Sequence, residues 1–155
     1  MMDVFRVSQC RYINDLTGTG AALYGGRWNS KGIYVLYASL TPSLALLENI
    51  VHMSSIPLEE YCLVKWNIPA GKIAELKVAV LPPDWASYPA PVKLKEIGDE
   101  FIRVNFFLGL KLPSAIMPEE NIILLNPQHP DFKKIKTGDI RNITFDARLF
   151  SKTPT

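Results

Sequence analysis

Residues 25–29 read GGRWN, and the apolar run IYVLYAS follows at residues 33–39. Two successive glycines allow backbone conformations that other residues avoid, and they let a ligand approach the backbone N–H groups closely. The guanidinium of Arg27 carries a rigid fork of donors that matches phosphate or carboxylate. The segment is therefore either a loop that grips an anion or a plain turn, with Arg27 stacked on Trp28 or paired with a surface acid.

The apolar run after this segment predicts a buried strand, and other short runs bounded by Gly, Pro or Asn predict further strands. The predicted strands are Val4–Val7, Ile33–Ala38, Tyr61–Trp66, Ile73–Val78, Ser114–Met117 and Asn121–Asn126.

Two segments predict helices. Pro42–Met53 follows Thr41, a favourable N-cap, and places proline at the first helical position. The second helix runs from about Val92 to Asn105, although Gly98 lowers its helix propensity. Because these helices do not alternate regularly with the strands, we expect an α+β fold with mixed or antiparallel sheets and few helices.

The composition is that of a single soluble globular domain, which we expect to span residues 1–155. Hydrophobic residues make up 48% of the chain and charged residues 21%, which excludes a disordered chain. No apolar run reaches the roughly 20 residues of a membrane span, and no signal peptide is evident. The net charge is +2 and the basic residues are scattered, which argues against nucleic-acid binding. We therefore expect a cytoplasmic protein that binds neither membrane nor nucleic acid.

The two cysteines, Cys10 and Cys62, stand alone and far apart in the sequence. The chain has no CxxC or HExxH motif and only two histidines, so we expect no metal site. A disulfide is possible, but reduced thiols in a cytoplasmic protein are the simpler expectation.

Glu48 lies in the first predicted helix, most of whose circumference is apolar. At about 100° per residue, Glu48, Asn49 and His52 share a narrow polar wedge. A carboxylate on a mostly buried helix either faces a cleft or pairs structurally, here with His52 one turn later. Ser114 follows a proline and carries no sign of a serine hydrolase, because the GxSxG elbow is absent.

Taken in order, these segments resemble the RES domain family, which is named for an arginine, a glutamate and a serine. The first block comprises GTGA, GGRWN, a glycine, YAS and the helix TPSLALLENIVH with its glutamate. The closing block comprises PSA, the ENIILLNP segment, a His-Pro loop and a final DARL. The resemblance covers almost the whole chain, and the combination of motifs is specific where each alone is not.

The resemblance implies an ADP-ribosyltransferase-like fold and a toxin of a bacterial toxin–antitoxin pair. Such toxins break the nicotinamide–ribose bond of NAD⁺, which is their substrate, and no cofactor or metal is expected. The partner is an Xre-type helix-turn-helix antitoxin that caps the active site. The implied catalytic residues are Glu48, Arg27 and Ser114, and the implied substrate-binding residues are Arg27, Tyr37, Ser114, Gly26 and Trp28.

Each of these residue types fits a need of the chemistry. Arg27 can hold the diphosphate, and Glu48 can stabilise the positive charge that develops on the ribose. Tyr37, and with it Trp28, can stack on nicotinamide or pack the wall of the site, and Ser114 can bond ribose or phosphate. The acceptor stays open between water, phosphate and a protein side chain, as does a non-catalytic interaction module with the same fold.

Overall fold

The computed structural model describes residues 1–150 of the chain. A single seven-stranded sheet has the order β4-β5-β6-β2-β1-β3-β7, in which β4 and β5 are parallel and the other neighbours antiparallel. The α+β prediction is confirmed. The helices are α1 (Thr19–Tyr24), α2 (Pro42–Ile50) and α3 (Val92–Val104), and the strands are β1 (Met2–Gln9), β2 (Leu36–Ser39), β3 (Tyr61–Ile68), β4 (Ile73–Glu75), β5 (Gly109–Pro113), β6 (Asn121–Leu125) and β7 (Lys136–Ile143).

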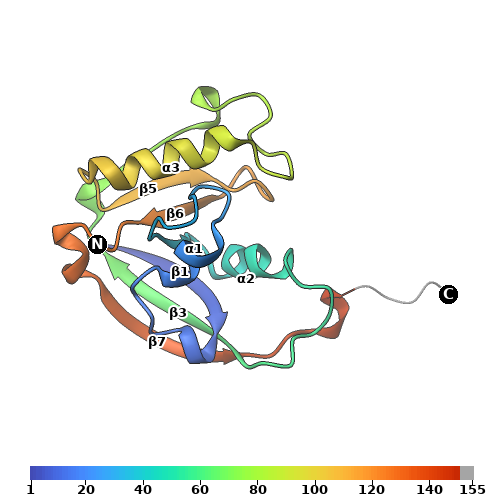
Figure 1. The fold of residues 1–155 in the computed structure, drawn as a ribbon. Helices are drawn as coiled ribbons and strands as arrows, with labels where there is room; N and C mark the ends of the chain where they lie inside the picture. Colours follow the sequence, from blue (N-terminus) through green and yellow to red (C-terminus); the bar gives the residue numbers. More distant parts are fainter. Residues whose placement is uncertain (151–155) are drawn as a thin grey trace.

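β6 is buried on both faces and separates two hydrophobic clusters. Successive side chains of a strand point to opposite faces. Ile123 accordingly belongs to the cluster of Trp66, which includes side chains of β1, β2 and β3, whereas Leu124 belongs to the cluster of Trp28 and α3. In Figure 1, α3 runs across β5 and β6, while β1, β3 and β7 form the other half of the sheet and α1 and α2 lie near the middle. No helix within residues 1–150 is both long and apolar enough to cross a membrane.

The N-terminus of α2 follows the predicted pattern. The hydroxyl of Thr41 accepts a hydrogen bond from the Leu44 N–H at 3.1 Å, and Pro42 occupies the first turn. The cap satisfies one of the N–H groups that a helix leaves unpaired at its start. The helix ends at Ile50, three residues before the predicted end at Met53.

Gly98, the weak point of the second predicted helix, is the position where α3 touches the GGRWN segment. α3 continues through Gly98 without a break, and an added Cβ there would lie 1.7 Å from the carbonyl oxygen of Trp28. The next residue, Asp99, accepts a hydrogen bond from the Ser30 N–H at 2.9 Å. The glycine therefore costs helix propensity but allows α3 to pack directly on the loop backbone.

The predicted strand Ser114–Met117 is wrong. The strand of this region is β5, which ends at Pro113, and the chain then leaves the sheet in a bend. The hydroxyl of Ser114 accepts hydrogen bonds from the N–H groups of Ile116 and Met117, which holds the bend in place of a ladder. The predicted strands Ile33–Ala38 and Ile73–Val78 are shorter than expected, because only Leu36–Ser39 and Ile73–Glu75 are strands.

The expectation of reduced thiols is also wrong, because Cys10 and Cys62 form a disulfide. Gln9 at the end of β1 pairs with Tyr61 at the start of β3. Antiparallel pairing thus brings two cysteines 52 residues apart to a Cα–Cα distance of 4.9 Å, within the range that a disulfide requires. The spacing in sequence gave no sign of this proximity.

Replacing Gly98 with alanine should destabilise the protein by about 2 kcal/mol or more, since the new methyl group clashes with the Trp28 carbonyl. Urea denaturation followed by circular dichroism measures the loss. Gly20→Ala is the matched control, because Gly20 also lies in a helix and its Cβ would meet nothing within 4 Å. An equal stability of the two variants would contradict the close packing of α3 on the loop.

Candidate active site

The candidate site is a cavity of about 830 Å³ that lies where β1 and β2 meet. β1 pairs with β3 at eight positions but with β2 only at Phe5 and Ser39. Residues 5–7 of β1 and 37–39 of β2 both line the cavity. Its other walls come from residues 26–28 of the GGRWN loop, α2 and the two residues after it, Ala86, residues 88–90, Lys95 of α3 and residues 115, 116 and 122. A volume of this size suits a small-molecule ligand.

The GGRWN loop is fixed by the side-chain amide of Asn29, which is fully buried. The amide nitrogen donates to the carbonyl oxygens of Ala21 and Ile33, at 2.9 and 3.2 Å. The amide oxygen accepts a hydrogen bond of 2.6 Å from the hydroxyl of Tyr37, which in turn accepts one from the Trp28 N–H. A buried polar network of this kind holds one backbone conformation, because each broken bond would leave a group unsatisfied.

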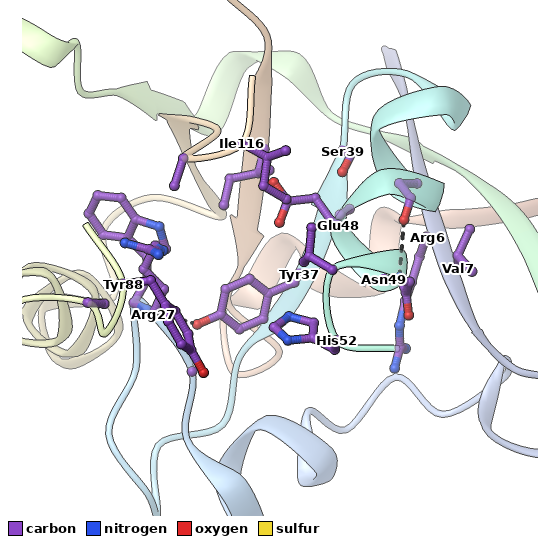
Figure 2. A pocket seen from close by; sticks show the side chains of 18 of the residues that line it. Arg6, Val7, Arg27, Tyr37, Ser39, Glu48, Asn49, His52, Tyr88 and Ile116 are labelled. Carbon is purple, nitrogen blue, oxygen red and sulfur yellow. Dashed lines mark hydrogen bonds between the residues drawn. The ribbon is translucent and has the colours of Figure 1, made fainter. Parts of the chain in front are cut away.

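Tyr37 joins this network to the cavity. Burial raises the pKa of its hydroxyl above its usual range, so the group remains protonated and can donate to Asn29. In Figure 2 the ring of Tyr37 stands in the centre of the cavity, with Arg27 on one side and His52 beside it. Tyr37 thus combines an aromatic face toward the cavity with a hydroxyl that holds the loop.

Gly26 and Trp28 support the loop from two sides. An added Cβ at Gly26 would lie 2.7 Å from the Tyr37 hydroxyl, so only glycine fits beside this network. Trp28 is only 1% exposed and packs in the cluster beneath α3. Trp28 is also among the residues that line the cavity, but the burial of its ring favours a role in holding the loop over stacking on a ligand.

Arg27 projects from the loop and lines the cavity. One terminal nitrogen, Nη1, donates to the carbonyl oxygens of Trp85 and Ser87, at 3.0 and 2.9 Å. These bonds tie the loop between β4 and α3 to the cavity wall. Within residues 1–150, Arg27 has no carboxylate partner, and its Nε and Nη2 donate to no protein group. The charge and the remaining donors are thus available to an anion in the cavity.

Glu48 lines the cavity from α2. The sequence left two alternatives open for this carboxylate, and the structure has the first of them, in which it faces a cleft. The hydroxyl of Ser114 donates to Glu48 Oε1 at 2.7 Å. The alternative pairing with His52 is not formed, since no hydrogen bond or ion pair joins these two side chains within the described chain. The protein thus orients the carboxylate through a residue 66 positions away.

Ser114 itself is completely buried and is not among the residues that line the cavity. Its hydroxyl donates to Glu48 and accepts from two backbone N–H groups, so its hydrogen-bonding capacity is used within the protein. The geometry thus places Ser114 behind Glu48, where its hydroxyl orients the carboxylate.

The fold brings to the cavity several polar residues that the sequence analysis did not name as site residues. They are Arg6 of β1, Asn49 of α2, His52 just after α2, Tyr88 and Lys95. Among the described residues that line the cavity, Arg6, Arg27 and Lys95 are cations and Glu48 is the one carboxylate. Arg6 could have been noticed as a charged residue inside a predicted strand, but Tyr88 and Lys95 carry no signal in the sequence. A cavity with excess positive charge attracts anionic ligands.

No group of three His, Cys, Asp or Glu side chains within residues 1–150 is arranged to hold a metal ion.

The RES domain family model matches residues 3–146. The chain belongs to the RES family. The segments that carry Arg27, Glu48 and Ser114 all lie inside the match, so the resemblance seen in the motifs is confirmed.

The relatives of this RES chain are named as toxins. It is 38% identical over 151 residues to a protein named Toxin Res from Yersinia enterocolitica, covering 96% of this chain and 99% of the relative. It is also 38% identical over 144 residues to a protein named Prs ADP-ribosylating toxin from Sphingobium sp., covering 90% and 89%. The chain is thus a RES-family toxin.

The fold of the RES chain is similar to that in the crystal structure of the M. tuberculosis MbcT–MbcA toxin–antitoxin complex. The TM-score is 0.78, and the match covers 92% of this chain and 84% of the other. Sequence identity is 14%, so this similarity establishes a shared fold.

Replacing Tyr37 with phenylalanine should destabilise the RES chain by about 1–3 kcal/mol, since it leaves the buried Asn29 oxygen and the Trp28 N–H without a partner. Tyr34→Phe is the matched control, because Tyr34 is 42% exposed and its hydroxyl makes no hydrogen bond within the described residues. Urea denaturation compares the two. A Tyr37→Phe variant as stable as Tyr34→Phe would refute the role of the network.

Proposed function

We propose that this RES toxin breaks the bond between nicotinamide and ribose in NAD⁺ and thereby inhibits growth. One observation carries the proposal: Glu48 lines a cationic cavity and is oriented by Ser114 at 2.7 Å. A fixed carboxylate in such a cavity suits a reaction in which positive charge develops on a substrate that also carries phosphates.

The reaction makes few demands beyond these groups. As the C1′–N bond breaks, both electrons leave with nicotinamide, which becomes neutral and needs no general acid. The ribose is left with oxocarbenium character, as in glycoside cleavage. The carboxylate of Glu48 stabilises this positive charge and can orient the acceptor that attacks C1′. No step calls for a metal ion or a cofactor.

Arg27 is the proposed partner of the diphosphate. Its Nε and Nη2 donate to no protein group within residues 1–150, and no carboxylate there neutralises its charge. A guanidinium binds phosphate oxygens through paired N–H groups. The bonds from Nη1 to Trp85 and Ser87 hold the fork in place, which lowers the entropy that binding costs. Tyr37 offers the aromatic face for nicotinamide.

The acceptor is proposed to be water or phosphate, so that the toxin depletes NAD⁺. A protein side chain is the second candidate, favoured by the relative named Prs ADP-ribosylating toxin. Incubation with NAD⁺ and added phosphate distinguishes these outcomes. Hydrolysis gives ADP-ribose, phosphorolysis gives ADP-ribose-1″-phosphate, and transfer to protein labels a protein band when the NAD⁺ is labelled.

We further propose that an Xre-type helix-turn-helix antitoxin caps the cavity and that both proteins act in the cytoplasm. The similar fold of MbcT was solved in a toxin–antitoxin complex. Tyr88 lines the cavity and is 87% exposed, which provides an aromatic contact at its mouth for a partner. A non-catalytic binding module is the remaining alternative, and the absence of any NAD⁺ turnover would favour it.

Glu48→Gln should lower kcat for nicotinamide release by about 100-fold or more, because the amide keeps the shape but not the charge that stabilises the oxocarbenium. The amide oxygen still accepts from Ser114, so the fold is preserved. Nicotinamide release from NAD⁺ is measured by chromatography. Glu59→Gln, at an exposed position outside the cavity, is the matched control. Equal rates for wild type and Glu48→Gln would overturn the proposed chemistry.

Arg27→Ala should raise KM for NAD⁺ at least about tenfold with a much smaller fall in kcat, because it removes binding to the diphosphate. Arg27→Lys keeps the charge without the fork, and we expect an intermediate KM. Steady-state kinetics over a range of NAD⁺ concentrations separate the two constants. An unchanged KM in Arg27→Ala would rule out this role.

A further inference from the structure

Glu120 opens the ENIILLNP segment, and its side chain reaches the start of the helix that carries Glu48. The hydroxyl of Thr41, the N-cap of α2, donates to Glu120 Oε1 at 2.7 Å. The same hydroxyl accepts from the Leu44 N–H, so it serves as donor and as acceptor within the protein. Glu120 is half-buried and does not line the cavity, so its carboxylate has no direct access to a ligand there.

The backbone of Glu120 closes the turn that begins at Ser114. Its carbonyl oxygen accepts from the Ser114 N–H at 3.0 Å, and its N–H donates to the carbonyl oxygen of Met117 at 2.9 Å. The Ser114 hydroxyl accepts from the Ile116 N–H inside the same turn. Residues 114–120 therefore form one hydrogen-bonded turn that carries both the serine and the glutamate.

α2 is attached to this turn at two points. Thr41 at its N-terminus bonds the Glu120 side chain, and Glu48 in its last turn bonds the Ser114 hydroxyl, each at 2.7 Å. Each bond joins a hydroxyl to a carboxylate, so both belong to the stronger class of hydrogen bonds. At about 1.5 Å per residue, the two points lie roughly 10 Å apart along the helix axis. A helix held at one point can pivot about it, whereas a second point at this distance fixes its direction.

Backbone pairing brings Thr41 and Glu120 together. β2 and β6 pair antiparallel, and just beyond them the Leu40 N–H donates to the carbonyl oxygen of Asn121 at 3.1 Å. Continuing the register of the two strands places Thr41 opposite Glu120. The sheet itself thus delivers the two side chains to each other at the start of α2.

Resting on the proposed function, we infer that Glu120 is a positioning residue for Glu48. Its carboxylate holds the N-cap of α2, and its backbone holds the turn whose serine orients the catalytic carboxylate. Loss of the Glu120 side chain frees the start of the helix and leaves the Ser114 bond as a pivot. Glu48 then samples a wider range of positions relative to C1′, and small displacements of a catalytic group lower the rate strongly.

Glu120→Ala should lower kcat for nicotinamide release about tenfold or more, with KM for NAD⁺ within about twofold of wild type, because Arg27 is unchanged. Glu120→Gln should keep at least about half of the wild-type kcat, since its amide oxygen still accepts from Thr41. Glu119→Ala is the matched control, because Glu119 is exposed and does not line the cavity. Equal kcat values for Glu120→Ala and Glu119→Ala overturn the inference.

Two substitutions at Thr41 separate the helix cap from the link to Glu120. An ionised aspartate caps a helix as well as threonine does, but it cannot donate a hydrogen bond to Glu120 and repels it. Thr41→Asp should therefore lower kcat as Glu120→Ala does, whereas Thr41→Ser keeps both bonds and should retain the wild-type kcat. If Glu120→Ala does not fold, these two variants decide the question, and equal activity of the two overturns the inference.

A double variant distinguishes positioning from a general structural effect. If Glu120 acts through the Glu48 carboxylate, adding Glu120→Ala to Glu48→Gln should lower kcat by less than about twofold further. A purely structural role would lower kcat by the same factor in both backgrounds, and that result overturns the inference. Thermal unfolding of each variant shows that the assays use folded protein.

Hydrogen exchange of α2, followed by mass spectrometry, tests the attachment without the reaction. The α2 amides should exchange at least about tenfold faster in Glu120→Ala than in Glu119→Ala. If this difference is seen but wild type releases no nicotinamide, the proposed reaction is wrong and Glu120 still fixes the helix that carries Glu48. If wild type releases nicotinamide and neither kcat nor exchange responds to Glu120→Ala, the function stands and the inference is wrong. Equal exchange in the two variants overturns the inference whatever the reaction.

Discussion

The buried amide of Asn29 is the interaction on which the candidate site depends. It ties the GGRWN loop to α1 at Ala21, to the following segment at Ile33 and to the hydroxyl of Tyr37 on β2. Because Asn29 is fully buried, no water can replace a lost partner, and the loop keeps one conformation. That conformation turns Trp28 into the core and leaves Arg27 on the cavity wall. The loop conformation thereby buries the ring of Trp28 and leaves the guanidinium of Arg27 at the cavity.

The position of the cavity follows from the sheet. β1 and β2 pair at a single position, so the side chains on either side of Phe5 and Ser39 border an open space that α2 and the loop between β4 and α3 enclose. α2 supplies Glu48, and the bend after β5 supplies the serine that orients it. The carboxylate is thus held by groups from distant parts of the sequence. Such positioning by buried partners is what allows a charged group to act at a fixed distance from a reacting atom.

Sequence patterns predicted the elements that carry their own local signals. Thr41 and Pro42 marked the start of α2, and the apolar residues of β6 marked a strand buried on both faces. β7 was not predicted, because nearly all its residues are exposed and polar and it belongs to the sheet only through pairing with β3. No strand forms at the predicted Ser114–Met117. The hydroxyl of Ser114 accepts local hydrogen bonds from the N–H groups of Ile116 and Met117 instead of leaving them to pair with another strand, and β5 ends just before Ser114.

The sequence by itself determined the family, the α+β class and the identity of Arg27, Tyr37 and Glu48 as cavity residues, since these depend on residue type and order along the chain. Tertiary structure alone decided what depends on contacts between distant segments. It buried Ser114 behind Glu48, buried the Trp28 ring and joined Cys10 to Cys62 at the ends of β1 and β3. It also brought Arg6 of β1 to the cavity. A linear pattern records which side chains are present, but burial and the distance between partners arise only when the sheet and helices pack.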